Sequence, residues 1–257
     1  MFDDLKTAQG WIIAGKVVVD GRVVTKPGAP VKPSARITLR GGAPARFASR
    51  GGEKLDHALR RFAIDLAGKV CLDAGASTGG FTDCMLQHGA RRVYAVEAGF
   101  GQLRGRLAAD PRVVSMERTN LSEVRADRLE PTIEFAAADL SYLSLRKAVP
   151  ILAGLFTHHA PVMVCLIKPL YEGLPQGRID DRPALRHVLR GLLADLAAAR
   201  FPVLDLCPSP LIGGRGAVEF LANFGPGVPS EKIDLMVERA IAELRSAPSR
   251  ESPDPDD

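Results

Sequence analysis

The stretch Val70–Phe81, VCLDAGASTGGF, decides the fold class that this chain is expected to have. VCLD is an apolar run that closes on an acid, as a buried strand does, and GASTGG then leads into an expected helix over residues 81–88. A glycine-rich turn between a strand and a helix lets a ligand approach the backbone close to the helix N-terminus. The stretch therefore predicts either a cofactor-binding loop or a purely structural tight turn.

The spacing of the glycines excludes two common nucleotide loops. The stretch does not fit G-x-G-x-x-G, which disfavours a dinucleotide fold, and no G-K-[ST] closes it as in a P-loop. The next apolar run, RVYAVEAG, ends in Glu97, an acid that can accept hydrogen bonds from both ribose hydroxyls of a nucleoside. A cationic sulfonium would also favour the acids Asp73, Glu97 and Asp139 at expected strand ends. These features favour S-adenosylmethionine (SAM) as the cofactor.

Apolar runs and helical patterns alternate over the central part of the chain, which predicts an α/β fold with a doubly wound parallel sheet. The seven expected strands match a Rossmann-like methyltransferase, and they are Val70–Asp73, Arg92–Glu97, Val113–Glu117, Ile133–Asp139, Val162–Ile167, Val203–Cys207 and Val218–Asn223. Helical periodicity is clearest over residues 182–199 and 230–245.

The N-terminal part predicts a separate small module. A short helix over about residues 3–14 precedes two valine-rich runs that flank Asp20-Gly21, a hairpin signal, and Ile37–Arg40 resembles a further strand. We expect a module over residues 1–42, a glycine- and arginine-rich linker over 43–52, a catalytic domain over 53–245 and a disordered acidic tail over 246–257.

Basic residues concentrate near the N-terminus. Residues 1–60 hold eleven Lys and Arg against five Asp and Glu, although the whole chain has a net charge of only +4. Such a surplus indicates a phosphate-binding surface, or else a chance clustering of solvated charges. The candidate RNA contacts are Lys16, Arg22, Lys26, Arg46 and Arg50.

Composition also excludes several classes of protein. The four cysteines form no CxxC pair, which is typical of buried thiols in a reducing, cytoplasmic compartment. No signal peptide and no apolar run of about 20 residues is present, so we expect no membrane partner. No metal site is predicted, because the adjacent His158 and His159 point in different directions. A monomer is slightly favoured, although the sequence leaves the oligomeric state open.

Four polar residues stand where polar side chains are costly unless they are paired. Lys54 begins an expected helix, Asp139 and Lys168 close apolar strands, and Glu219 falls within one. They form either a structural ion-pair cluster or a catalytic group, and perturbed lysines at strand ends mark sites only probabilistically.

Several motifs resemble one family in its order: SRGGEKLDHAL, LDAGASTGGFTDCML, VYAVEAGFGQL, DPRVVSMERTN, ADLSYLSL and LIKPLYE. From about Ser49 to Phe224 the chain resembles the TlyA (haemolysin A-like) branch of the FtsJ-like ribose methyltransferases. The resemblance implies SAM-dependent 2′-O-methylation of ribosomal RNA, with ribosomal RNA or a ribosomal subunit as partner. It implies a Lys-Asp-Lys-Glu tetrad at Lys54, Asp139, Lys168 and Glu219. The expected cofactor contacts are Asp73, Gly75, Ala76, Ser77, Thr78, Gly79, Gly80, Phe81, Glu97, Asn120 and Asp139.

The resemblance extends to the N-terminal module. Residues 5–40 resemble the later part of a small RNA-binding module related to one in a small-subunit ribosomal protein, and the family's preceding helix has no counterpart here.

The resemblance also implies a role for Lys168. Lys168 would act on the ribose hydroxyl as a base or as a hydrogen-bond partner of the developing oxyanion. The alternatives are methylation of another RNA or a small molecule, a ribosome-binding protein with a vestigial site, and a membrane-active cytolysin.

Overall fold

The computed structural model describes residues 5–40, 45–177, 181–213, 216–229 and 231–244. The chain divides into two compact units, Met1–Arg46 and Phe47–Asp257, and each is described by itself. The expected acidic tail over residues 246–257 lies outside the described residues. Among the residues that are described, no helix is long and apolar enough to cross a membrane.

The N-terminal unit is one helix with a small antiparallel sheet. Its elements are α1 (Leu5–Ile13), β1 (Val17–Val19), β2 (Arg22–Val24) and β3 (Ile37–Leu39). The strands lie in the order β2-β1-β3. Asp20 and Gly21 join β1 to β2 with φ angles of 49° and 81°. Positive φ at both turn residues is what a two-residue hairpin of this type requires, so the predicted hairpin is confirmed.

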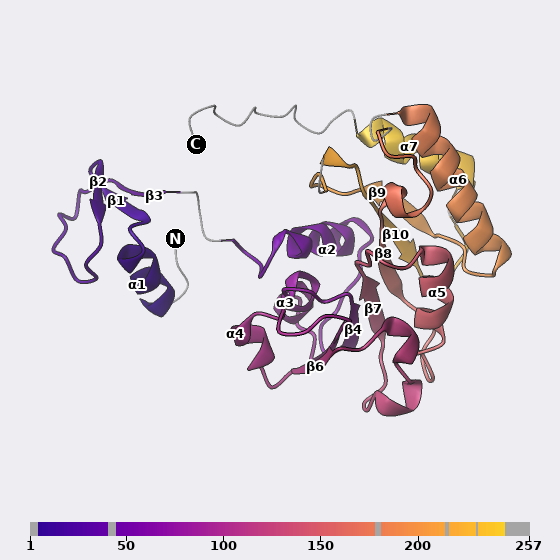
Figure 1. The fold of residues 1–257 in the computed structure, drawn as a ribbon, viewed down its shortest axis with the longest axis horizontal. Coiled ribbons are helices and arrows are strands. Elements are labelled where there is room, and N and C mark those ends of the chain that lie inside the picture. Colours follow the sequence, from indigo (N-terminus) through magenta and orange to yellow (C-terminus); the bar gives the residue numbers. More distant parts are fainter. Residues whose placement is uncertain (1–4, 41–44, 178–180, 214–215, 230, 245–257) are drawn as a thin grey trace. The chain divides into compact units, whose positions relative to one another are not determined.

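The larger unit contains a seven-stranded sheet in the order β6-β5-β4-β7-β8-β10-β9 (Figure 1). Its strands are β4 (Val70–Ala74), β5 (Arg92–Glu97), β6 (Val113–Glu117), β7 (Phe135–Ala138), β8 (Met163–Ile167), β9 (Asp205–Pro208) and β10 (Phe220–Phe224). The helices are α2 (Arg50–Arg61), α3 (Gly80–Gln87), α4 (Gly105–Ala108), α5 (Leu145–Ala153), α6 (Arg182–Ala198) and α7 (Ile233–Glu243), with 3-10 turns η1 (Leu121–Glu123), η2 (Ala126–Arg128) and η3 (Pro169–Tyr171). The α/β class and the seven strands agree with the prediction.

One strand departs from the expected parallel sheet. The pairs among β6, β5, β4, β7 and β8 are parallel, but β10 is antiparallel to both β8 and β9. Hydrophobic periodicity marks a strand but not its direction, so the sequence did not reveal this reversal. The strand also begins at Phe220, which places Glu219 just before it rather than inside it.

Both faces of the sheet are buried, as the apolar runs predicted. Along β4, Val70, Leu72 and Ala74 belong to one core cluster and Cys71 to the other. The first cluster includes residues of α5, α6 and α7, and the second includes residues of α2 and α3. Figure 1 shows these two sets of helices on opposite sides of the strands.

The expected linker over residues 43–52 is shorter in the structure. Phe47 and Ala48 are buried in the core, and Ser49 caps α2, which begins at Arg50. The glycines that suggested a flexible segment serve close packing instead. A Cβ on Gly52 would lie 2.3 Å from Phe47 Cβ and 2.8 Å from the carbonyl oxygen of Gly80 on α3.

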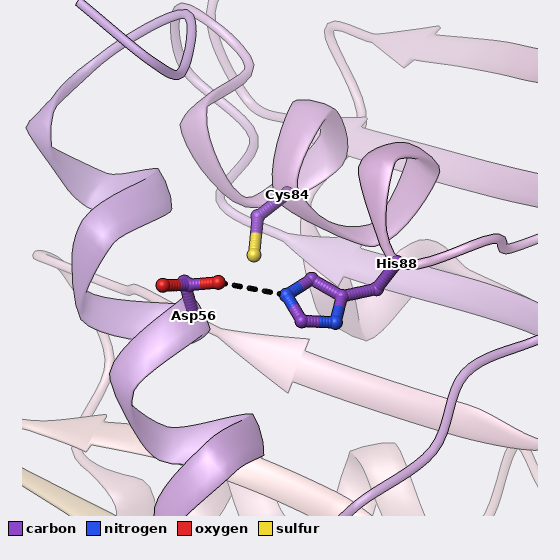
Figure 2. A group of neighbouring side chains, drawn as sticks. All are labelled: Asp56, Cys84 and His88. Carbon is purple, nitrogen blue, oxygen red and sulfur yellow. Dashed lines mark hydrogen bonds and ion pairs between the residues drawn. The ribbon is translucent and has the colours of Figure 1, made fainter.

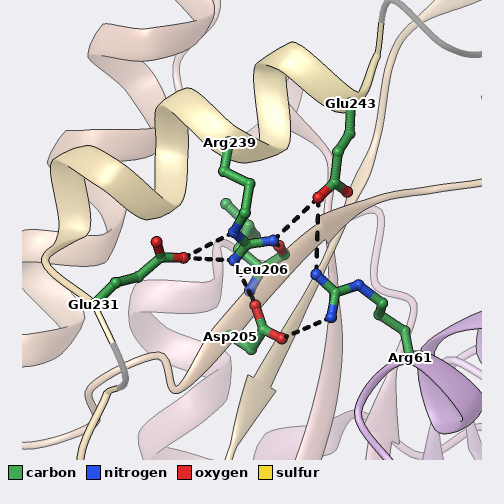
Figure 3. Close-up of polar contacts among 6 residues, drawn as sticks. All are labelled: Arg61, Asp205, Leu206, Glu231, Arg239 and Glu243. Carbon is green, nitrogen blue, oxygen red and sulfur yellow. Dashed lines mark hydrogen bonds and ion pairs between the residues drawn. The ribbon is translucent and has the colours of Figure 1, made fainter.

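An ion-pair network ties α7 to β9 and α2 at the far edge of the sheet (Figure 3). Arg239 on α7 contacts Asp205 and Glu231 at 2.6 Å each. Arg61 on α2 contacts Asp205 at 3.5 Å and Glu243 at 3.7 Å. Although burial opposes it, donation of hydrogen bonds to Glu231 and Asp205 raises the pKa of the Arg239 guanidinium, which stays charged. The network holds the C-terminal helix on the edge strand.

We expect Gly52→Ala to destabilise the fold by about 1–3 kcal/mol, because neither Phe47 Cβ nor a carbonyl oxygen can move away without repacking. An alanine in an exposed helix would instead stabilise by about 1 kcal/mol. Gly51→Ala is the matched control on the same helix, since its Cβ would meet only ordinary contacts at 3.4 Å or more. Urea unfolding of both variants measures the difference, and equal stabilities would contradict the packing argument.

Candidate active site

The site forms where strands of the central sheet meet at one edge. Asp139 follows β7 and Lys168 follows β8, and the carboxyl ends of parallel strands lie together. Because β10 runs antiparallel, its first residue, Phe220, pairs with the last residue of β8, Ile167. Glu219 therefore lies at this same edge beside Lys168, although it precedes its strand.

Lys54 and Glu219 form a nearly buried ion pair. Lys54 Nζ lies 2.5 Å from Glu219 Oε2, and the two side chains are 11% and 7% exposed. Lys54 projects from the first turns of α2, so this contact joins α2 to the start of β10. A buried charge without a partner would be costly, and the pair removes that cost from both residues.

Lys168 is held by two oxygens. Its Nζ lies 2.6 Å from Asp139 Oδ1 and donates a hydrogen bond of 2.8 Å to Ser141 Oγ. The same Nζ lies 5.8 Å from the centroid of the Tyr171 ring, on η3. These contacts fix the position of one ammonium or amine group at the mouth of the site.

A cavity of about 630 Å³ opens beside these residues, and its lining includes Ser141, Lys168, Tyr171, Gln176 and Glu219. The predicted tetrad is therefore split into two ion pairs that each supply one member to the cavity wall. Lys168 and Glu219 line the cavity, and Asp139 and Lys54 are their respective ion-pair partners. A cavity of this size is within the range of small-molecule and nucleotide sites.

The glycine-rich loop is a strained turn fixed against β7. Gly75 has φ +88°, and a Cβ there would lie 2.6 Å from the carbonyl oxygen of Asp139. Ser77 and Gly79 also have positive φ, and Gly79 caps α3. Strain of this kind persists where the surrounding structure requires it, and it is frequent at ligand sites.

Glu97, the last residue of β5, organises the loop. Its Oε2 accepts a hydrogen bond of 2.9 Å from the Ser77 amide, and its Oε1 accepts one of 2.7 Å from the Gly99 amide. Each carboxylate oxygen has a second lone pair, so Glu97 can still accept hydroxyl hydrogen bonds from a ribose.

Asp73 is fully buried at the end of β4. Thr82 Oγ1 donates a hydrogen bond of 2.6 Å to its Oδ2, while Oδ1 has no hydrogen-bond partner among the residues that the structure describes. Burial, opposed by the hydrogen bonds from Thr82 and assisted by the nearby charges of Asp139 and Glu97, raises the pKa of Asp73 to about 7. Three acids and an unsatisfied buried acceptor suit a ligand that carries a positive charge and N–H donors.

The structure separates some other predicted residues from this edge. Phe81 is 3% exposed, so its side chain is part of the core beside α2, and only its backbone is available to a cofactor. Asn120 is exposed and begins η1, where its amide donates to Glu123 Oε2 at 2.8 Å.

The predicted RNA contacts fall in both units. Lys16, Arg22 and Lys26 are exposed in the N-terminal unit, and Lys16 Nζ lies 5.1 Å from the centroid of the Trp11 ring. Arg50 belongs to α2 of the larger unit, where its guanidinium donates to the Ile212 carbonyl at 2.9 Å. The last candidate, Arg46, ends the N-terminal unit.

Sequence reasoning missed Ser141, Tyr171 and Gln176. Ser141 stands two residues after Asp139, and Tyr171 three residues after Lys168. Their closeness in sequence to the predicted catalytic residues was the signal that could have identified both.

Two family descriptions match the chain, one over each unit. Residues 47–225 match the family described as FtsJ-like methyltransferase, and residues 5–37 match the S4 domain. The 16S/23S rRNA (cytidine-2′-O)-methyltransferase TlyA of Mycobacterium tuberculosis is 37% identical over 90% of this chain and 89% of its own length. Hemolysin A of Brachyspira hyodysenteriae is 36% identical over 84% of this chain and 92% of its own.

A solved structure is similar over nearly the whole chain. A protein of Streptococcus thermophilus that is named as a hemolysin is 35% identical, with a TM-score of 0.70 over 95% of this chain and 93% of its own. This chain is thus similar over most of its length to proteins with both kinds of name.

We expect the raised pKa of Asp73 to make the stability of the ligand-free protein pH-dependent. Below the unfolded pKa of about 3.9 the carboxyl is protonated in both states and its contribution is fully present. As the pH rises towards the folded pKa of about 7, the unfolded state alone loses the proton, so stability falls by about 1.4 kcal/mol per pH unit. Above that pKa the loss is constant.

Asp73→Asn removes this titration, so the variant should gain stability relative to the parent chain between pH 5 and about 7. Urea unfolding at a series of pH values measures the gap. Asp127→Asn is the control, since Asp127 is fully exposed and the neighbouring Arg125 lowers its pKa. If the difference in free energy of unfolding between the parent chain and Asp73→Asn does not change with pH, the raised pKa of Asp73 is contradicted.

Proposed function

Because the chain belongs to the FtsJ-like methyltransferase family, we propose that it transfers a methyl group from SAM to a ribose 2′-hydroxyl of ribosomal RNA. The named activity of the Mycobacterium tuberculosis relative supports the substrate, and the match of residues 5–37 to the S4 domain supports an RNA partner. Such a substrate would place the protein in the cytoplasm.

The observation that carries the proposal is the position of Lys168. Its Nζ is fixed by Asp139 and Ser141 on the wall of a cavity large enough for a nucleotide. A ribose hydroxyl is a poor nucleophile until its proton is drawn away, and a positioned basic or hydrogen-bonding group lowers this barrier. In this proposal Lys168 would hold that hydroxyl or take its proton.

Asp139 and Glu219 would orient the amino groups of the two lysines. Asp139 and Ser141 together restrict Lys168 Nζ to one position, while Glu219 presents a carboxylate on the same cavity wall. Lys54 pairs with Glu219, so the carboxylate of Glu219 on the cavity wall is balanced by a positive charge. Holding the reacting oxygen in line with the methyl group is mainly a positioning problem, which a rigid set of ion pairs serves.

The cofactor would lie along the glycine-rich loop, where SAM supplies an electrophilic methyl group. Glu97 would accept the ribose hydroxyls, while the acids Asp73 and Asp139 favour a sulfonium and an ammonium group. The unsatisfied Oδ1 of Asp73 supports this assignment, because a buried acceptor needs a donor. Gly75, Ala76, Ser77, Thr78, Gly79 and Gly80 would form the backbone wall of the site, with the backbone of Phe81 following and Asn120 at its edge.

The N-terminal unit would contribute RNA affinity rather than chemistry. Lys16, Arg22 and Lys26 are exposed on it, Arg46 is its last residue, and Arg50 lies near the start of the larger unit. Contacts of this kind go to phosphates, which position an RNA without reading its sequence.

We expect Lys168→Ala to lower kcat for ribosomal RNA by at least about 100-fold while SAM binding is retained, because the residue faces the hydroxyl and not the glycine-rich loop. The assay transfers labelled methyl from SAM to purified ribosomal subunits, free ribosomal RNA and transfer RNA, followed by analysis of the labelled nucleoside. Lys147→Ala is the matched control, since Lys147 is exposed on α5.

Two outcomes would each contradict a different part of the proposal, the first its substrate and the second its catalytic residue. Label that appears only in transfer RNA, or on a base, would show that the substrate or the acceptor atom is wrong. Full activity of Lys168→Ala would leave the ribose methylation intact but remove Lys168 from the chemistry.

A further inference from the structure

A second group of chemically active side chains lies away from the cavity, between α2 and α3. Asp56 comes from α2, Cys84 from α3, and His88 from the residue that caps α3. One ligand atom from each lies within 4.8 Å of the other two. Figure 2 shows the thiol, a carboxylate oxygen and an imidazole nitrogen turned towards the same space between the two helices.

Helix geometry explains why the three side chains converge. Cys84 and His88 are four residues apart, so they share one face of α3. The two helices approach closely because glycines occupy their contact, where a Cβ on Gly80 would lie 2.9 Å from the Gly52 amide nitrogen. Asp56 follows Gly52 by one helical turn and so faces the same part of α3.

The three side chains of this group are largely buried and contact one another or Arg60, unlike a cluster of exposed acids on the surface. Cys84 is fully buried, and the side chains of Asp56 and His88 are 7% and 25% exposed. His88 Nε2 lies 2.8 Å from Asp56 Oδ1, and the Arg60 guanidinium pairs with the other carboxylate oxygen of Asp56. The partly exposed imidazole leaves one side open to solvent.

We propose that Asp56, Cys84 and His88 form a zinc-class metal site that joins α2 to α3. Sulfur, imidazole nitrogen and carboxylate oxygen are the three ligand types that Zn²⁺ takes in proteins, and water from the open side completes a tetrahedron. The Cys84 thiol gives its proton to solvent as its sulfur binds, so Cys84 and Asp56 together balance the charge of the ion. Arg60 then serves as the outer partner that orients the Asp56 carboxylate.

The ligand atoms must rearrange to accept the ion. They lie within 4.8 Å of one another, whereas bonds of about 2.3 Å to sulfur and about 2.1 Å to nitrogen or oxygen would set Cys84 Sγ about 3.6 Å from the other two atoms. Metal–ligand bonds of about 2.0–2.2 Å to nitrogen and oxygen require the two atoms to stand about 3.4 Å apart in a tetrahedron. The His88–Asp56 contact must therefore open by about half an ångström, which a rotation of the partly exposed imidazole can supply. The three residues are scattered over the sequence, which explains why no metal site was expected from it.

Such a site would fix the two helices that flank the reaction centre. Lys54, which pairs with Glu219, lies two residues before Asp56 on α2. Helix α3 begins at Gly80, where the glycine-rich loop ends. A metal between the helices would hold the lysine pair in place relative to that loop.

The test uses the full, untagged chain with Zn²⁺ alone and, separately, with Co²⁺ as a spectroscopic substitute. We expect one equivalent of either ion to bind, and the Co²⁺ form to show thiolate charge-transfer and tetrahedral ligand-field absorption. Cys84→Ala should abolish the charge-transfer band. His88→Asn and Asp56→Asn should weaken Zn²⁺ binding by at least about 100-fold, since even loss of an outer partner costs roughly 10–100-fold.

Matched controls separate a site from adventitious binding. Cys165→Ala removes another buried thiol, on β8, and His187→Asn removes an exposed imidazole on α6, and neither should change the stoichiometry. Zn²⁺ should also raise the unfolding temperature of the parent chain but not that of Asp56→Asn. Absence of stoichiometric binding, or binding unchanged by Cys84→Ala and His88→Asn, would overturn the proposal.

Discussion

The antiparallel pairing of β10 with β8 is the constraint on which the arrangement of the site depends. Residues that follow parallel strands meet at one edge without further help, and Asp139 and Lys168 do so. Glu219 precedes its strand, so in a wholly parallel sheet it would lie at the opposite edge. Reversal of β10 pairs Phe220 with Ile167 and thereby places Glu219 on the same cavity wall as Lys168.

Lys54 reaches this edge by a different route. It comes from α2, outside the sheet, and its position depends on how closely α2 packs against α3. Gly52 allows that approach because any side chain there would strike Phe47 and the Gly80 carbonyl. The ion pair between Lys54 and Glu219 thus depends on two independent contacts, the pairing of β10 with β8 in the sheet and the packing of α2 against α3. Each pair in the site has one member that faces the cavity and one that supports it.

The sequence predicted the elements better than their directions or contacts. Apolar periodicity identified seven strands and the long helix α6, and the Asp20-Gly21 turn identified the hairpin, since these signals are local. The direction of β10 depends on which strands it contacts, and no local pattern records that. Residues 47–52 resembled a linker because glycine suggests flexibility, whereas here it permits close packing. The sequence proposed the four residues of the tetrad, but their pairing as Lys54–Glu219 and Lys168–Asp139 needs distances.

Electrostatics explains why the cofactor edge can be both buried and acidic. Asp73 has no cationic partner in its hydrogen bonds, and burial together with Asp139 and Glu97 raises its pKa to about 7. Near pH 7 this carboxyl is partly neutral, and its raised pKa makes the ligand-free fold less stable than it is at acidic pH. A cation that binds beside Asp73 would favour the ionised carboxylate. The attraction between the two charges would be stronger in this buried site than in water. Binding and proton release at this edge are therefore coupled, and a cationic ligand should bind more tightly as the pH rises through 7.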